Sequence, residues 1–211
     1  MQILFLESID STQKHLKELI AQGRVTPPYS VAASMQTDGV GSRGNVWMGE
    51  ENNLFLSFAI PLSDLPQDLK LESASIYFSY IMKETLEEFG SKVWLKWPND
   101  FYINDKKIGG MITNLLGDCI VCGIGLNIKN APEGFEKLDV YVAREKLLES
   151  YFSKIEEKSL WKQVFSKFKL EFYKNQNFYT HKKNLIISLG DATLQGDGSI
   201  VINGERIYSL R

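Results

Sequence analysis

Residues 96–110 read Lys-Trp-Pro-Asn-Asp-Phe-Tyr-Ile-Asn-Asp-Lys-Lys-Ile-Gly-Gly and predict a small β-hairpin. Residues 101–103 are apolar or aromatic and suit a strand, and Asn104-Asp105 suits a two-residue turn that tolerates positive φ. The return strand then starts at Lys106. This arrangement fixes which side chains of the stretch share a face.

In the simplest register of this hairpin, Tyr102 pairs with Lys107 and Asp100 falls opposite Gly109. Side chains two residues apart along a strand share a face. We therefore expect Asp100, Tyr102 and Lys107 to point the same way, with Lys106 turned to the other side.

The hairpin combines parts that suit a bound phosphate. Asp100 and Lys107 supply an anion and a cation on one face, and Gly109-Gly110 supplies strand backbone that a ligand can approach closely. A carboxylate, a lysine and a bare strand can together hold a metal-bound phosphate. A surface hairpin with ordinary charges is the alternative that these residues leave open.

The whole chain has the composition of a globular protein. Its 211 residues suit one domain, or one domain with a small appendage, and 44% of them are hydrophobic, including 12 Phe, 9 Tyr and 4 Trp. The start of the chain lacks the basic segment of a signal peptide, and no apolar run approaches a membrane span. We expect a cytoplasmic protein that is not inserted in a membrane.

The net charge is −2, but the charges are unevenly distributed. Residues 141–183 form a basic segment with 10 Lys/Arg against 5 Asp/Glu. Such a segment could meet an acidic partner or nucleic acid. Its lysines alternate with apolar residues at helical spacing, however, which favours solvated faces of helices.

The only two cysteines form a C-x-x-C pair, Cys119 and Cys122. A zinc site would need a second pair of ligands, and a redox pair should stand at the start of a helix. The β-branched neighbours instead predict a strand, so we expect two buried core thiols.

The pattern of elements predicts an α/β (α+β) fold with a mixed, largely antiparallel sheet and packed helices, because hairpin signals outnumber βαβ units. After residue 183 the helical period disappears. We therefore divide the chain into a main domain, 1–183, and a small β appendage, 184–211, of about four strands. Strands are predicted at 3–6, 29–35, 54–60, 92–96, 101–103, 106–116 and 118–128, and helices after an Asp10 or Ser11 cap and at 69–89, 143–158 and 159–175.

A glycine-rich loop, residues 36–47, contains the spacing G-x-G-x-x-G from Gly39 to Gly44. The dinucleotide fingerprint of this form must open a helix, but here a strand at 54–60 follows. A kinase loop would require catalytic and metal-binding signatures downstream, which are missing. We interpret the loop as a flexible segment whose backbone N–H groups and Arg43 wrap an anion, with Trp47 as an aromatic wall. A plain mobile connection is the alternative.

Together these motifs resemble the biotin protein ligases, in order over nearly the whole chain. The residues that carry the resemblance are Ser11-Thr12-Gln13 (Ser-Thr-Asn in the family), Gln36 before the glycine loop, Trp47 at its end, Lys96 to Asp100, Asp105 to Gly110, Gly123 to Asn127, and Asp197-Gly198 with Ser209-Leu210-Arg211 in the tail. The tail is similar to the SH3-like C-terminal domain of bacterial members.

Two departures from the family pattern stand out. Val40, Ser42 and Asn45 occupy loop positions where the family usually has arginines, so Arg43 is the only basic residue there and the adenylate intermediate should escape faster. Only ten residues precede Ser11, too few for a DNA-binding domain. We expect a ligase that does not bind DNA.

The resemblance implies activation of biotin by ATP with Mg²⁺ and transfer to a lysine of a biotin carboxyl carrier protein, with a homodimer as one possible assembly. The implied catalytic residues are Lys107, Arg43 and Asp100, the last also as a magnesium ligand. The implied biotin-binding residues are Ser11, Thr12, Gln36, Gly39, Trp47, Gly110, Gly123 and Gly125. The implied ATP- and adenylate-binding residues are Gly39, Gly41, Arg43, Trp47, Asn99, Lys107, Asn127 and Arg211.

Two other functions remain open. A lipoate or octanoate ligase or transferase shares the implied fold and the transfer of an acyl group to lysine, although Lys96 to Asp100 beside the glycine loop fits the biotin branch better. A non-catalytic biotin- or nucleotide-binding module is the second, and the presence of Lys107 and Asp100 argues against it.

Overall fold

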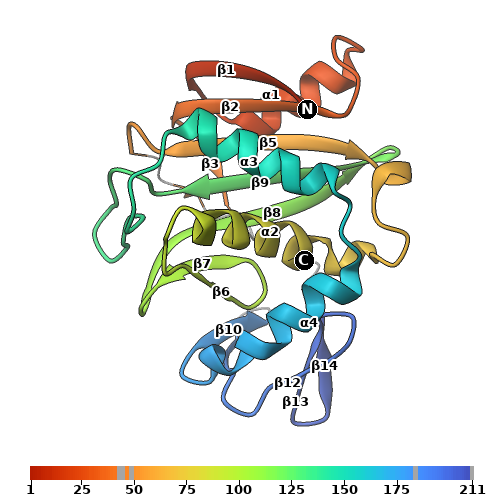
Figure 1. The fold of residues 1–211 in the computed structure, drawn as a ribbon, viewed down its shortest axis with the longest axis vertical. Helices are drawn as coiled ribbons and strands as arrows, with labels where there is room; N and C mark the ends of the chain where they lie inside the picture. The colour runs from red at the N-terminus through yellow and green to blue at the C-terminus, as the bar shows by residue number, and fades with distance from the viewer. Residues whose placement is uncertain (42–45, 48–49, 183–184, 210–211) are drawn as a thin grey trace.

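A computed structural model describes residues 1–41, 46–47, 50–182 and 185–209 of the chain. A seven-stranded sheet in the order β1-β2-β5-β9-β8-β7-β6 forms its centre (Figure 1). β1 and β2 run parallel, and every other neighbouring pair in the sheet is antiparallel. The predicted mixed, largely antiparallel sheet is confirmed.

The sheet strands are β1 (Gln2–Ile9), β2 (Tyr29–Gln36), β5 (Leu54–Pro61), β6 (Trp94–Lys96), β7 (Asp100–Ile103), β8 (Lys106–Leu116) and β9 (Cys119–Leu126). A separate small hairpin is made by β3 (Gly39–Val40) and β4 (Val46–Trp47). The α-helices are α1 (Thr12–Ala21), α2 (Ala74–Glu88), α3 (Arg144–Glu156) and α4 (Trp161–Glu171). The tail contains β10 (Tyr179–Lys182), β11 (Leu185–Ser188), β12 (Thr193–Leu194), β13 (Ile200–Ile202) and β14 (Glu205–Ile207).

Helix α1 begins and ends where its sequence indicates. The Ser11 side chain accepts a hydrogen bond from the Lys14 backbone N–H, which satisfies one of the unpaired donors at the helix start. Gly23 follows the helix with a φ of +66°, a conformation that glycine adopts without strain. Leu16 and Leu19 form its buried stripe.

Helix α2 is buried around most of its circumference, as its apolar composition predicts. It is shorter than the predicted 69–89, because a 3₁₀ turn, Leu71–Ser73, precedes its first α-helical turn. Within the described residues, every helix is too short or too polar to cross a bilayer.

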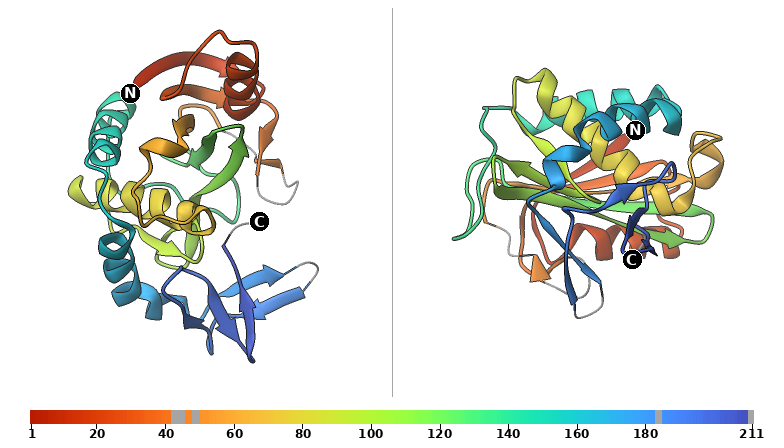
Figure 2. Two further views of the ribbon diagram at one scale, coloured as in Figure 1. Left: turned by 90° about the vertical axis from the view of Figure 1, so that its right-hand side faces the viewer. Right: turned by 90° about the horizontal axis from the view of Figure 1, so that it is seen from below.

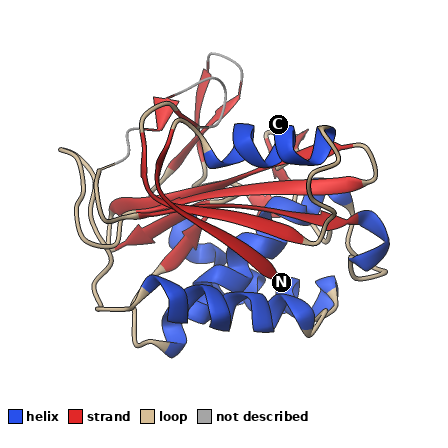
Figure 3. Cartoon of the chain, turned by 90° about the horizontal axis from the view of Figure 1, so that it is seen from above, coloured by secondary structure: helices blue, strands red, loops and turns tan. Residues whose placement is uncertain are grey.

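The helices cover the two faces of the sheet unequally. α1 lies on one face, and α2 and α3 lie on the other (Figures 2 and 3). Under α1, Leu16 and Leu19 pack against Val31, Ala59 and Val121 in a small cluster. The opposite face carries the main core, in which Phe58 of β5 meets aromatic rings of α2 and α3 edge-on, at centroid distances of 5.4 to 5.8 Å. The face of α1 is therefore left partly open beyond the helix.

The tail forms the small β unit expected at the C-terminus. It consists of the β10–β11 hairpin and a three-stranded sheet of β12, β13 and β14. β10 precedes residue 184 and pairs with β11 after it, so the hairpin crosses the predicted boundary. The division into domains at residue 183 stays a prediction.

Two tryptophans that precede the tail in the chain hold it through hydrogen bonds from their indole N–H groups. The Trp97 indole N–H donates to the carbonyl oxygen of Gly198 at 2.8 Å, and that of Trp161 donates to the carbonyl oxygen of Gly196 at 2.9 Å. Trp97 is fully buried. A buried carbonyl that loses its donor has no water to replace it, which makes this bond expensive to remove.

We predict that Trp97→Phe lowers the free energy of unfolding by about 2–3 kcal/mol, because it leaves a cavity and an unpaired carbonyl at Gly198. Urea denaturation measures the change. Tyr141→Phe is the control, since the side chain of Tyr141 is 86% exposed and its change should stay within about 0.5 kcal/mol. Equal stability of the two variants would contradict the proposed anchoring of the tail.

Candidate active site

The β7–β8 hairpin follows the predicted register only in part. Tyr102 pairs with Lys107, as predicted, and Asn104 in the turn has a φ of +53°. The prediction that Asp100 lies opposite Gly109 is wrong, because Asp100 pairs with Gly110. A β-bulge opposite Phe101 and Tyr102 shifts the register there. The extra residue of the bulge lies on β8 and changes the direction of the side chains beyond it.

Despite the bulge, Asp100 and Lys107 meet as expected. The Lys107 Nζ lies 2.6 Å from the Asp100 Oδ1, and the Lys96 Nζ lies 3.6 Å from the Asp100 Oδ2. Lys106 is exposed. The carboxylate is thus held between two ammonium groups in a half-buried position, where charge-assisted bonds are stronger than at a free surface.

Tyr102 stays neutral beside these charges. Loss of hydration on burial, and secondly the charge of Asp100, raise the pKa of Tyr102 to about 12. The Lys96 Nζ lies 5.6 Å from the centre of its ring. The phenol can contribute an aromatic face near neutral pH but no negative charge.

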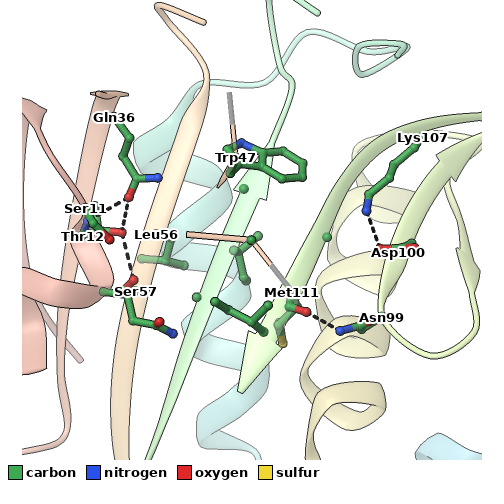
Figure 4. A pocket seen from close by; sticks show the side chains of 17 residues that line it. Ser11, Thr12, Gln36, Trp47, Leu56, Ser57, Asn99, Asp100, Lys107 and Met111 are labelled. Carbon is green, nitrogen blue, oxygen red and sulfur yellow. Dashed lines mark hydrogen bonds and ion pairs between the residues drawn. The ribbon is translucent and has the colours of Figure 1, made fainter. Parts of the chain in front are cut away.

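A neutral polar cluster stands at the other end of the site (Figure 4). The Gln36 Oε1 accepts hydrogen bonds from the Thr12 backbone N–H at 2.8 Å and from the Thr12 hydroxyl at 2.9 Å. The Thr12 hydroxyl also lies 2.9 Å from the Ser57 hydroxyl. Because α1 begins at Thr12, the same segment that caps the helix carries the polar groups of the site.

Trp47 lies between the two polar ends. A Cβ placed on Gly125 would lie 2.6 Å from its indole ring, so the ring rests directly on bare strand backbone. The Lys107 Nζ is 5.7 Å from the ring centre. Gly110 is bare for a similar reason, since a Cβ there would lie 3.1 Å from the Asp100 Oδ1.

These residues line a cavity of about 50 Å³. The cavity is lined by Ser11, Thr12, Gln13, Gln36, Gly41, Trp47, Leu56, Ser57, Asn99, Asp100, Lys107, Gly110, Met111, Ile112, Gly123, Ile124 and Gly125. Most of the residues named from the sequence are therefore brought together.

Some predicted residues lie elsewhere. Asn127 is buried, and its side-chain amide donates to the carbonyl oxygen of Glu136 at 3.2 Å instead of lining the cavity. Gly39 does not line the cavity; it pairs with Trp47, and a Cβ there would lie 2.7 Å from the Trp47 carbonyl oxygen and 2.8 Å from the Gln36 Nε2. Arg43 and Arg211 fall outside the described residues, as do Ser42 and Asn45.

Six wall residues were not among the predicted site residues: Gln13, Leu56, Ser57, Met111, Ile112 and Ile124. Gln13 and Ile124 had a usable signal, because each lies inside a motif that carries the resemblance. Ser57 had one as well, because it is the only polar residue in the otherwise apolar run of β5. Ile112 had none, since its place depends on which strands pair.

The C-x-x-C pair is not part of this site. Cys122 is buried as predicted, but Cys119, at the start of β9, is only partly buried, so that half of the prediction is wrong. Burial raises the pKa of both thiols, and the charge of Asp118 adds to the effect at Cys119. The described residues contain no group of three or more His, Cys, Asp or Glu side chains placed to hold a metal.

Comparison with known proteins places the chain in a family. Residues 5–127 match the biotin/lipoate A/B protein ligase family, and the chain belongs to that family. A structure of biotin acetyl coenzyme A carboxylase synthetase from Helicobacter pylori, with bound biotinylated ATP, is 38% identical with a TM-score of 0.94, over 98% of this chain and 99% of that one.

Two curated relatives are also similar to the chain. The bifunctional ligase/repressor BirA of Bacillus subtilis is 31% identical over 63% of this chain and 42% of its own length. The BirA of Escherichia coli is 33% identical over 60% of this chain and 40% of its own length. The chain thus spans about two fifths of the length of these curated relatives.

We predict that Gly125→Ala displaces Trp47, because the new methyl group would lie 2.6 Å from the indole ring. Iodide quenching of fluorescence should detect the change as added accessibility of one of the 4 tryptophans. Gly196→Ala is the matched control, since a Cβ there meets nothing within 4 Å. If both variants quench like the unmodified protein, Trp47 does not rest on Gly125 in solution.

Proposed function

We propose that the protein is a biotin protein ligase that activates biotin with ATP and transfers it to a lysine of a biotin carboxyl carrier protein. The observation that carries the proposal is the polarity of the cavity. Neutral hydrogen-bonding groups stand at one end, an apolar wall in the middle and the Lys107–Asp100 pair at the other end. Biotin has the matching order: a ureido ring, an aliphatic chain and a carboxylate.

The neutral end suits the ureido ring. The hydroxyls of Thr12 and Ser57 and the amide of Gln36 can exchange their mutual hydrogen bonds for bonds to the ring. Ser11 also lines this end. Trp47, which rests on the bare backbone of Gly125, supplies the apolar wall beside the aliphatic chain.

In the first step, an oxygen of the biotin carboxylate forms a bond to the α-phosphorus of ATP. The bond from that phosphorus to the bridging oxygen breaks, and pyrophosphate leaves with the electron pair. Two anions must approach each other, so a positioned cation is worth more here than an acid or a base. Lys107 supplies that cation.

Asp100 acts in this scheme by positioning Lys107. Its two oxygens face Lys107 at 2.6 Å and Lys96 at 3.6 Å. A carboxylate oxygen is also the kind of ligand that Mg²⁺ prefers, so Asp100 would be the residue to hold the ion, which would offset phosphate charge; this role stays a prediction.

In the second step, the neutral amine of the carrier lysine attacks the acyl carbon of biotinyl-5′-AMP. The bond from that carbon to the phosphate oxygen breaks, AMP leaves with its electron pair, and the amine nitrogen releases one proton to solvent. Gly41 and Asn99 line the cavity, and their contacts with the nucleotide stay predictions. The roles of Arg43, Arg211, Gly39 and Asn127 stay predictions, as do a cytoplasmic location and a homodimer.

Transfer of radiolabelled biotin to a purified acceptor domain, in the presence of ATP, tests the proposal directly. Parallel reactions with lipoate and octanoate test the rival members of the family. We expect label from biotin alone. Label from lipoate or octanoate alone would move the protein to the other branch, and binding of biotin without pyrophosphate release would make it a binding module.

We predict that Lys107→Ala slows adenylate formation by at least about 100-fold, because the cation that offsets the developing phosphate charge is lost. Biotin affinity should change much less. Pyrophosphate release in single turnover and equilibrium dialysis with labelled biotin measure the two effects.

Lys106→Ala provides the matched control, since Lys106 is the neighbouring lysine and is exposed. Its rate should stay close to that of the unmodified enzyme. Near-normal adenylation in Lys107→Ala, or an equal loss in both variants, would remove Lys107 from the mechanism.

A further inference from the structure

One fully buried amide, the side chain of Asn53, holds the loop that follows β9. Asn53 lies between Trp47 and the first residue of β5. Its Oδ1 accepts hydrogen bonds from the backbone N–H groups of Ile128 at 2.9 Å, Lys129 at 3.0 Å and Asn130 at 3.3 Å. Its Nδ2 donates to the Asn130 carbonyl oxygen at 2.9 Å. The loop after β9 therefore takes its shape from a side chain on a different element.

The three N–H groups converge on one point, an arrangement of backbone that commonly binds an anion. Here an uncharged oxygen of the same chain takes that place, so the loop is fixed without a ligand. A buried amide whose oxygen accepts several hydrogen bonds is costly to replace, because each N–H group that loses its partner stays unsatisfied.

The same loop is bonded to the backbone beside the catalytic lysine. The Asn127 N–H donates to the carbonyl oxygen of Ile108 at 2.8 Å, and the Glu136 N–H donates to the carbonyl oxygen of Lys107 at 3.0 Å. The ladder between β8 and β9 begins only at Gly109, so β9 itself does not reach these two residues. On this side of β8, the loop supplies the hydrogen bonds where the ladder ends.

We propose that Asn53 is a positioning residue for adenylate formation: it holds the loop after β9, and the loop holds the backbone of Lys107. The inference rests on the proposed function, in which Lys107 supplies the cation, and adds a residue to it. The ammonium group of a lysine stands at the end of a flexible side chain, so its place in a site depends on a firmly held backbone. Asn53 does not line the cavity and acts on the reaction through Lys107.

Asn53→Ala removes all four bonds and tests the proposal. We expect pyrophosphate release in single turnover to slow about 10-fold, while the Kd for biotin stays within about twofold. Asn53→Asp should stay within about threefold of the unmodified rate, because a carboxylate oxygen can accept from the same three N–H groups. Ser30→Ala is the matched control, since it removes another bond of a fully buried side chain, from the Ser30 hydroxyl to the Gln2 carbonyl oxygen, far from this loop.

A double-mutant cycle gives the readout that a loss of stability alone would not move. If Asn53 acts through Lys107, Asn53→Ala should slow the Lys107→Ala enzyme by less than about twofold, although it slows the unmodified enzyme about 10-fold. Asn53→Ser, a second variant that keeps a small polar group, enters the same cycle in case the alanine variant does not fold.

The outcomes separate this inference from the proposed function. If the unmodified protein neither releases pyrophosphate with biotin nor labels an acceptor domain, the proposed function fails and this inference with it. If it does both, three results would leave the function standing and overturn the role of Asn53. These are an unchanged rate in the folded alanine or serine variant, an equal loss in Ser30→Ala, and a loss in the Lys107→Ala background as large as in the unmodified enzyme.

Discussion

The close approach of β8 and β9 at their glycines is the constraint on which the site depends. Gly110 pairs with Gly125, and a Cβ on Gly109 would lie only 2.5 Å from the Gly125 carbonyl oxygen. The strands can meet in this way only without side chains at these positions. We call this stretch of strand backbone without side chains the floor of the site, because residues of other elements contact it directly. Trp47 rests on Gly125, and the Gln13 amide stands above Gly123.

The floor also separates two kinds of electrostatic environment. At one end, the hydroxyl and amide groups of Thr12, Ser57 and Gln36 are uncharged and satisfy one another. At the other end, Asp100 and its lysines concentrate charge on the β7–β8 hairpin. Under the proposed function, the substrate would lie across this floor with its ring at the neutral end and its carboxylate at the charged end. Orientation is thus determined before any chemistry occurs, which is how an enzyme converts binding into effective concentration.

Local signals predicted the parts of this site that depend on local structure. The Asn104-Asp105 turn fixed the pairing of Tyr102 with Lys107, and a serine before an amphipathic segment located the start of α1. The bulge at Phe101 was missed, because the choice between a regular and a bulged strand depends on the neighbouring strand rather than on its own residues.

Long-range pairing explains the other omissions. The position of Ile112 beside Gly123 follows from the β8–β9 register, which no short pattern determines. The partial exposure of Cys119 likewise reflects its place at the end of a strand rather than any feature of the C-x-x-C spacing. The residues correctly grouped from the sequence belong to recognisable motifs, whereas wall residues such as Leu56 and Ile112 lie outside them.

The bond between Trp97 and the tail links distant parts of the chain mechanically. Trp97 stands three residues before Asp100, its indole N–H holds Gly198, and its backbone N–H donates to the Asn175 side chain at 2.8 Å. Strain applied at Gly198 therefore reaches the segment that carries the charged pair. Loosening of the tail would broaden the range of orientations of Asp100 before it unfolded the protein. Substitutions far from the cavity, at the surface of the small β unit, could then appear in kinetics as losses of alignment while the substrate still binds.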